Sequence, residues 1–503
     1  MVYNNILKKK SVWIYCTLSL LLVFIILIVA IAVIGPSNLI DVYQEIFYGS
    51  RKNWVFLVAG SHGWSNYRHQ ADVSHAYQIL LNNGISADHI IVMMVDDIAY
   101  NTQNPFPGEL FNKPNGTDVY QGIKIDYSGE DVTKENFLNI LQGNKESMKT
   151  VGSHRVIESD RSDNIFVNFV GHGTSGMLSF PSGHLYADEL NNAFLSMYSN
   201  RTFNNMLLYI EACNSGSLFD GILSEFNNIF ALTAASPRES SYGVYLIEFT
   251  ATKTLTFLGD EFSVSWMEDQ ANFGLLYPSQ VKEIVKKRTV LNHFNTIRAL
   301  VKQSNVMPYG DFSVGQDKLS SYIGKPPEVF SKPSNSSQYS YSSKNKIRVF
   351  SDSIISAKSD KIYQMSEEKN SEQWKQRVEH NNIMRKIMDR VFNGILQGVV
   401  RKFPNFNNIN LTELREYPSR LPLDVFPCYR QTLDQITKNC FSLPKNTYSL
   451  KLVHIFFNLC ARAINSKTWK SEEFDFVIQN TVLDVCIGNL STFPNLKKII
   501  DTY

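Results

Sequence analysis

The chain has 503 residues, of which 44% are hydrophobic and 19% are charged. This composition is that of an ordinary globular protein and excludes a mostly disordered, collagen-like or multi-pass membrane chain. Lysine and arginine number 49 and aspartate and glutamate 47, a net charge of +2, so no general basic character points to nucleic acid as a partner. At about 150 residues a domain, the length allows about three domains.

An uncharged, mostly apolar run covers residues 11–34 and follows Lys8, Lys9 and Lys10. At about 1.5 Å per residue, a helix of this length crosses a hydrocarbon core of about 30 Å. The run is longer than the apolar core of an ordinary signal peptide, and no A-x-A cleavage site follows it. We therefore predict that residues 1–34 are a membrane-spanning signal anchor, or alternatively a long signal peptide, with the rest of the chain lumenal or extracellular.

Sequons and cysteines agree with an oxidising compartment. Glycosylation sequons begin at Asn115, Asn200, Asn335, Asn410 and Asn489. Four of the six cysteines lie in the last 76 residues: Cys428, Cys440, Cys460 and Cys486. They are expected to form disulfides, and the sequence alone leaves three pairings open. Of the other two, Cys16 lies in the apolar run and Cys213 stands alone in mid-chain.

The region after the apolar run alternates strand and helix patterns. Continuous apolar runs predict buried strands at 54–59, 90–95, 165–170, 206–211 and 228–233. Helical spacing predicts helices at 71–82 and 134–142, and Asn83-Gly84 is a stop signal for the first. Because continuous runs suit strands that are covered on both faces, the pattern predicts an α/β fold with a parallel sheet flanked by helices.

Composition changes after about residue 324. Residues 325–346 are rich in Ser, Pro and Lys, which is typical of an exposed linker. From residue 366 onward the pattern is helical, with 19 Lys and Arg against 14 Asp and Glu, a net charge of +5. The preceding residues carry −3, so a basic helical domain could dock on a more acidic one.

Two candidate reactive residues follow neighbouring predicted strands. His172 comes after the strand at 165–170, within Gly-His-Gly, and Cys213 comes after the strand at 206–211. Reactive groups in open parallel sheets lie beyond the carboxyl ends of the strands. A thiol needs a base or a cationic neighbour to become a nucleophile near neutral pH. Although a lone cysteine is most often inert and buried, this pair predicts a Cys–His dyad.

Acyl transfer also needs donors for the oxyanion, and the amides of Gly173 and Cys213 lie in the same two loops. A zinc site is disfavoured, because Cys213 belongs to no C-x-x-C pair and the chain has no H-E-x-x-H motif. The sequence therefore favours a cysteine nucleophile without a metal.

Six segments carry a recognisable family pattern: residues 60–80, 93–122, 171–176 (GHGTSG), 209–219 (YIEACNSGSLF), 233–245 and 258–269. Together they resemble the legumain family of asparaginyl endopeptidases. The resemblance spans about residues 50–320 and returns more weakly at 454–460. It implies a caspase-like cysteine protease domain at 50–320, an activation linker at 321–365 and an all-α prodomain at 366–503.

The resemblance also implies roles for single residues. Cys213 would be the nucleophile, His172 the general base and acid, and Asn66 the residue that orients the histidine. The residues matching the S1 pocket are Arg68, His69, Glu211, Ser240, Ser241 and Asp260. An asparagine carboxamide has donors and an acceptor, so a pocket with both charge signs can satisfy both of its ends. The implied substrates are proteins or peptides with Asn, or Asp at low pH, at P1, and no cofactor or metal is implied.

For the C-terminal part the resemblance implies the pairs Cys428–Cys460 and Cys440–Cys486, and a prodomain that covers the active site as an intramolecular inhibitor. Acid would protonate carboxylates and weaken its docking. Candidate activation sites are Asp360, Asn345 and Asn370. The implied location is a lysosome-like or vacuole-like acidic compartment of the secretory pathway.

One position departs from the family pattern. Legumains typically have an aspartate immediately before the catalytic histidine, and this chain has Gly171, which puts peptide ligation in doubt. The GHG segment also resembles the GPI-anchor transamidase catalytic subunit, which is the alternative function. A third alternative is a catalytically silent binding protein, against which the presence of both Cys213 and His172 argues.

Overall fold

The computed structural model describes residues 52–249, 252, 254–276, 287–326, 347–349, 372–402, 411–418, 420–446, 448–465 and 471–492. From Asn53 onward the described residues belong to one compact unit. The predicted anchor, with Cys16, lies outside them, as do Asn345, Asp360, Asn370, Asn335 and Asn410. No helix within the described ranges is long and apolar enough to cross a membrane.

A six-stranded sheet lies at the centre of residues 53–326, in the order β11-β8-β7-β3-β1-β2. Its strands are β1 (Asn53–Ala59), β2 (Ile90–Met93), β3 (Asn164–Val170), β7 (Asn205–Glu211), β8 (Ile229–Thr233) and β11 (Met307–Gly310). Neighbouring strands are parallel except that β11 pairs antiparallel with β8. The predicted α/β fold with a largely parallel sheet is confirmed, and β11 is the strand that the apolar pattern missed.

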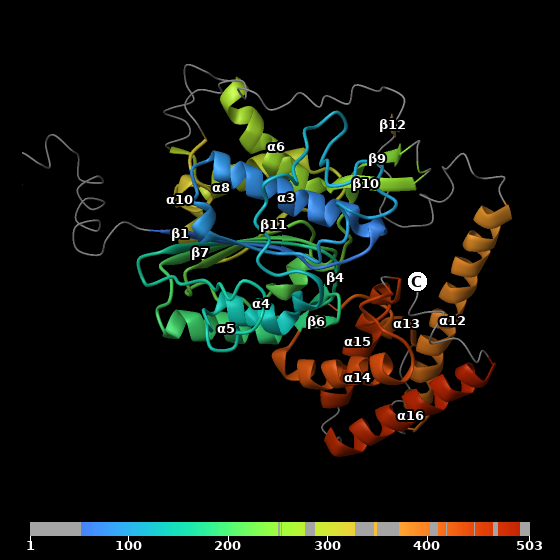
Figure 1. The fold of residues 1–503 in the computed structure, drawn as a ribbon. Coiled ribbons are helices and arrows are strands. Elements are labelled where there is room, and N and C mark those ends of the chain that lie inside the picture. The colour runs from blue at the N-terminus through green and yellow to red at the C-terminus, as the bar shows by residue number, and fades with distance from the viewer. Residues whose placement is uncertain are drawn as a thin grey trace, which may run out of the picture. The chain divides into compact units, whose positions relative to one another are not determined.

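Helices cover both faces of this sheet (Figure 1). One face carries α3 (Tyr67–Asn82), α6 (Glu261–Leu276) and α8 (Val290–Leu300), and the other carries α4 (Lys134–Leu141) and α5 (Ala187–Ser199). Alternate strand residues enter different cores: Val167 packs on the α4–α5 side and Phe166 on the α3–α6 side. Burial on both faces explains why the strands are continuous apolar runs.

The first predicted helix begins earlier than its pattern suggested but ends where the stop signal predicts. α3 begins at Tyr67, four residues before the predicted start, and its C-cap is Asn83. Gly84 follows with φ +85°, a left-handed conformation that favours glycine. The early start matters for the site, because it brings Arg68 onto the helix.

Two small sheets flank the central one. The first, in the order β10-β9-β12, contains β9 (Gly243–Phe249), β10 (Thr254–Asp260) and β12 (Ile347–Val349). The second is a meander of β4 (Gly173–Thr174), β5 (Met177–Phe180) and β6 (Gly183–Tyr186). β12 lies inside the predicted linker, where a short β-branched run pairs antiparallel with the edge of β9, so this part of the linker is a strand and not an irregular segment.

Short helices complete residues 53–326. They are α9 (Phe312–Gly315), α10 (Ser320–Ile323) and the 3₁₀ turns Trp64–Asn66, Ala87–His89, Gly129–Asp131 and Ser215–Leu218.

The described C-terminal residues are helical, as predicted. They form α12 (Glu372–Lys402), α13 (Leu411–Leu414), α14 (Phe426–Asn439), α15 (His454–Asn465) and α16 (Ser471–Thr492), with 3₁₀ turns at Leu423–Val425 and Ser449–Lys451. The Cys428–Cys460 disulfide joins α14 to α15, and the Cys440–Cys486 disulfide joins the end of α14 to α16. These are the two pairs that the family resemblance implies.

Candidate active site

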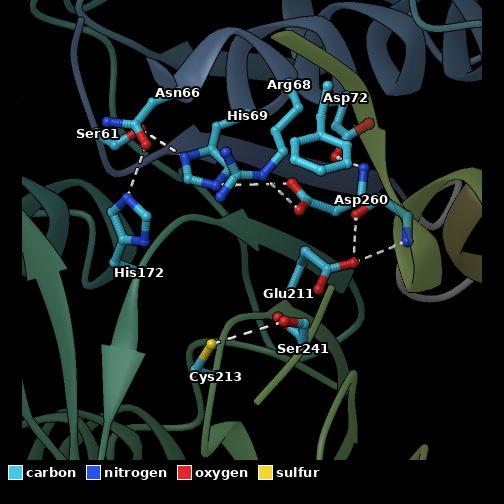
Figure 2. A network of polar contacts seen from close by, with 12 residues as sticks. Ser61, Asn66, Arg68, His69, Asp72, His172, Glu211, Cys213, Ser241 and Asp260 are labelled. Carbon is cyan, nitrogen blue, oxygen red and sulfur yellow. Dashed lines mark hydrogen bonds and ion pairs between the residues drawn. The ribbon is translucent and has the colours of Figure 1, made fainter. Parts of the chain in front are cut away.

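His172 and Cys213 leave the ends of two adjacent strands. β3 and β7 pair in register, with Val170 opposite Glu211, and the Gly171 amide donates to the Glu211 carbonyl at 3.0 Å. The two candidate reactive residues follow directly after this last rung of the ladder. The structure therefore brings their loops together at the carboxyl edge of the sheet (Figure 2).

The tautomer of His172 follows from its contact with Asn66. Asn66 Nδ2 donates to the His62 carbonyl at 2.7 Å, so Asn66 Oδ1 is the atom that faces His172 Nε2, also at 2.7 Å. Because Oδ1 can only accept, Nε2 carries the proton and Nδ1 has a free lone pair. Burial, together with the nearby positive charge of Arg68, lowers the pKa of His172 to about 3, so the imidazole is neutral over most of the pH range.

The thiol of Cys213 is also uncharged at rest. Burial raises its pKa, and this outweighs hydrogen bonds from Ser240 and Ser241 that act in the opposite direction. The Sγ atom lies 3.8 Å from the Ser241 carbonyl oxygen, and within the described residues no hydrogen bond joins it to His172. The two groups therefore form a neutral pair, in which the proton would have to leave the thiol as it attacks.

Hydrogen bonds fix the loop that carries Cys213. Asn214 adopts φ +55°, its amide donates to the Glu239 carbonyl at 2.8 Å, and its side chain donates to the Pro237 carbonyl at 3.0 Å. Ser217 Oγ donates to the Asn214 carbonyl at 2.6 Å and accepts from the Gly176 amide at 2.8 Å. Ser217 therefore ties the Cys213 loop to the loop that follows His172.

Gly173 lies directly against the backbone of Cys213. A Cβ atom added at Gly173 would be 2.7 Å from the Cys213 carbonyl oxygen and 3.0 Å from Ala212 Cβ. No real Cβ atom makes the shorter of these contacts, so close packing of the two loops requires glycine here.

A buried cluster of charged groups lies beside the dyad (Figure 2). Arg68 Nε donates to Asp260 Oδ1 at 2.7 Å. His69 Nε2 is 3.6 Å from Asp260 Oδ2, and His69 Nδ1 is 2.5 Å from Ser61 Oγ. The His69 and His172 rings meet edge to face at 4.9 Å, so the cluster is continuous with the dyad.

Glu211 provides a second carboxyl group in this cluster. Its Oε2 accepts from the Ser263 amide at 2.9 Å and from Ser263 Oγ at 3.1 Å, and the Ser241 side chain also bonds to this carboxyl group. Burial and the neighbouring Asp260 raise the pKa of Glu211 well above its ordinary value. Burial also raises the pKa of Asp260, although Arg68 opposes this effect.

The structure thus assembles the candidate site residues from distant elements. Arg68 and His69 come from α3, Glu211 ends β7, Asp260 ends β10, and Ser240 and Ser241 precede β9. The sequence analysis did not single out Ser61, Asp72 and Ser263, which bond to these groups, or Asn112, which bonds to Asp72. The position of Asp72 four residues after Arg68 was an available signal, because such residues share one face of a helix.

The C-terminal helices contact the loop that follows His172. Gly176 has φ +72°, and a Cβ atom added there would be 2.8 Å from the Phe426 ring and 3.0 Å from Leu421. Tyr429 of α14 meets Tyr186 edge to face at 5.9 Å. Burial raises the pKa of Tyr417, and its ring stacks on that of His454 at 4.3 Å.

An ion pair accompanies these apolar contacts. One Arg430 Nη donates to both carboxylate oxygens of Asp188, at 2.7 and 2.6 Å, and the guanidinium lies 4.8 Å from the centre of the Tyr186 ring. Helix α14 therefore holds the region that contains the His172 loop through both polar and apolar contacts.

Comparison with known proteins places this site in a family. Residues 53–325 match the peptidase C13 family. Legumain from Homo sapiens is 36% identical over 414 residues, which cover 82% of this chain and 89% of that protein. Legumain from Bos taurus is 37% identical over 414 residues, covering 81% and 89%. The vacuolar-processing enzyme delta-isozyme from Arabidopsis thaliana is 36% identical over 427 residues, covering 82% and 88%.

Among solved structures, caspase-1 from Spodoptera frugiperda matches 55% of this chain and 90% of its own, with 12% identity and a TM-score of 0.31. The sequence matches define the family by themselves. The chain belongs to the peptidase C13 family and is a cysteine endopeptidase.

Proposed function

We propose that this chain is the zymogen of an endopeptidase that hydrolyses peptide bonds after asparagine, and after aspartate at acidic pH. The observation that supports this most is the position of His172 and Cys213 at adjacent strand ends, beside a buried cluster of one guanidinium and two carboxyl groups. A pocket with both charge signs suits a P1 side chain that both donates and accepts hydrogen bonds.

In the proposed reaction, His172 Nδ1 takes the proton of Cys213 as Sγ attacks the scissile carbonyl carbon. The amides of Gly173 and Cys213 stabilise the oxyanion. The C–N bond then breaks as the imidazolium gives its proton to the leaving amine, which leaves a thioester on Cys213. Water, deprotonated by His172, hydrolyses this acyl-enzyme. Asn66 keeps the proton on Nε2 throughout, which leaves Nδ1 facing the reaction.

Specificity would come from pairing both ends of a carboxamide. The side-chain oxygen of a P1 asparagine would accept from Arg68, and its amide would donate to Glu211 or Asp260, with Ser240 and Ser241 completing the pocket. His69 would hold the geometry of this pocket. A P1 aspartate would add a carboxylate to a site that already holds two carboxyl groups unless it is protonated, so its cleavage is expected at acidic pH.

We further propose the roles of the remaining parts. Residues 50–320 would be a caspase-like protease domain, 321–365 the activation linker and 366–503 an inhibitory prodomain. The names legumain and vacuolar-processing enzyme support an acidic lysosome-like or vacuole-like compartment, reached with residues 1–34 as anchor or signal and with glycosylated sequons. Since Gly171 replaces the usual aspartate, hydrolysis is expected to exceed ligation.

Substitution of the nucleophile tests the function. The full chain, incubated at acidic pH, should cleave a peptide with asparagine at P1, and Cys213→Ala should abolish this cleavage. A peptide with glutamine at P1 is the specificity control. Undiminished cleavage by Cys213→Ala would disprove the proposal. Hydrolysis by the purified chain without partner subunits would exclude the transamidase alternative.

A further inference from the structure

Asp72 lies behind the charged pocket, on the far side of Asp260 from the dyad (Figure 2). It is on α3, one helical turn after Arg68, so both side chains reach the same neighbour. Arg68 Nε donates to Asp260 Oδ1 at 2.7 Å, and Asp72 Oδ2 accepts from the Asp260 backbone amide at 3.1 Å. A single helix therefore holds Asp260 by both its side chain and its main chain.

The other carboxylate oxygen of Asp72 also accepts a hydrogen bond. Asp72 Oδ1 accepts from Asn112 Nδ2 at 2.6 Å. The same Nδ2 donates to the Leu258 carbonyl at 3.0 Å, and Asn112 Oδ1 meets His75 Nδ1 at 2.8 Å. These contacts fix the orientation of the Asn112 amide, so it cannot turn to present an acceptor. Asp72 thus faces two fixed N–H donors.

The backbone beside Asp260 is packed against this contact. A Cβ atom added at Gly259 would lie 3.1 Å from Asp72 Oδ1 and 3.0 Å from Asn112 Nδ2. The end of β10 therefore passes directly over the Asp72–Asn112 pair. Asp260 is the residue that follows Gly259, so a shift of Asp72 would also displace Asp260.

A carboxyl group at this position is electrostatically unfavourable. Asp72 is fully buried, and burial together with Asp260 and Glu211 raises its pKa well above the ordinary value. An asparagine would remove the charge problem, but its side chain has one acceptor oxygen where the two fixed donors need two. The requirement for two acceptors explains why a carboxyl group is present.

We propose that Asp72 is a positioning residue for substrate specificity. It holds Asp260 in the place where Asp260 and Arg68 together contact the P1 side chain. The inference rests on the proposed function, because only there does Asp260 contact the substrate. Asp72 touches neither Cys213 nor His172, so its loss should weaken P1 binding and leave the chemical step largely intact.

Asp72→Asn tests this role at nearly constant volume. The variant replaces one acceptor with a donor that faces a fixed N–H group, so Asp260 loses part of its anchorage. With the acid-incubated full chain and a P1-asparagine peptide, KM should rise about ten- to thirtyfold, while kcat should change by less than about twofold. An unchanged KM in a folded variant would overturn the inference.

Asp126→Asn is the matched control. Asp126 is also a buried aspartate whose carboxylate accepts a backbone amide, that of Val92 at 3.1 Å, but it does so at β2, the outer strand of the sheet. This control should lower Tm without changing KM. If Asp72→Asn behaved in the same way, Asp72 would be a structural residue only.

Two further measurements keep the test decisive. If Asp72→Asn does not fold, Asn112→Ala should raise KM in the same direction by a smaller factor, and a wild-type KM there would overturn the inference. If the wild type cleaves after a residue other than asparagine, the proposed specificity fails, and the Asp72 variant is then measured with the accepted residue. An unchanged KM with that residue would reject the positioning role separately.

Discussion

Removal of the Arg430 side chain should loosen the contact between α14 and α5 at neutral pH. Arg430 is 27% exposed and Asp188 16%, so this pair is shielded from solvent much more than a surface ion pair. Arg430→Ala removes two charge-assisted hydrogen bonds, about 1.5–3 kcal/mol, and a cation–π contact of about 0.5–1 kcal/mol. Docking of α14 should weaken by about 2–4 kcal/mol.

At about 1.4 kcal/mol for each factor of ten, the fraction of molecules with α14 undocked should rise at least about thirtyfold. Because the Phe426 contact with Gly176 lies on the loop that follows His172, undocking of α14 should speed the alkylation of Cys213. The measurement is the rate of iodoacetamide labelling of Cys213 in the full chain near neutral pH, followed by peptide mass spectrometry. The rate should rise with the undocked fraction as long as redocking is faster than labelling.

Arg462→Ala is the matched control. Arg462 pairs with Glu413 within the C-terminal helices, and both side chains are 52% exposed. A pair as exposed as this contributes about 0–1 kcal/mol, so labelling should accelerate by less than about fivefold. The reasoning would be refuted if a folded Arg430→Ala variant were labelled at the wild-type rate.

Two predictions concern pH. Asn66→Asp places a carboxylate beside His172 Nε2, which should raise the pKa of His172 from about 3 by about one to two units. Because the general base must be neutral, the acidic limb of the pH profile of kcat/KM should then move to higher pH. An acidic limb that does not move would contradict the Asn66 contact. Glu211 has a raised pKa in the folded state, so it contributes stability at low pH that is lost as pH rises. The Tm of the wild type should therefore fall relative to that of Glu211→Gln as the pH rises above the ordinary glutamate pKa of about 4.3, and a constant difference would show that Glu211 ionises normally.

Five strands of the central sheet could be predicted from the sequence, and so could the positions of His172 and Cys213 after two successive strands. Strands such as β3 and β7 are buried on both faces, so their apolar runs are local signals that need no knowledge of their neighbours. β11 has the sequence Met-Pro-Tyr-Gly, which carries no apolar run, and it is a strand because it pairs with the edge of β8. β12 likewise depends on β9.

Some features of the candidate site could likewise be predicted from the sequence, and others could not. The sequence by itself predicted that a histidine and a cysteine follow two successive strands, and the family resemblance added Asn66 and the pocket residues. Only the tertiary structure decided which atom of His172 is free, that Asp72 holds Asp260 across 188 positions, and that Arg430 reaches Asp188 across 242. Local sequence encodes strands and turns because they depend on near neighbours, whereas hydrogen bonds between distant segments exist only after packing has brought their donors and acceptors together.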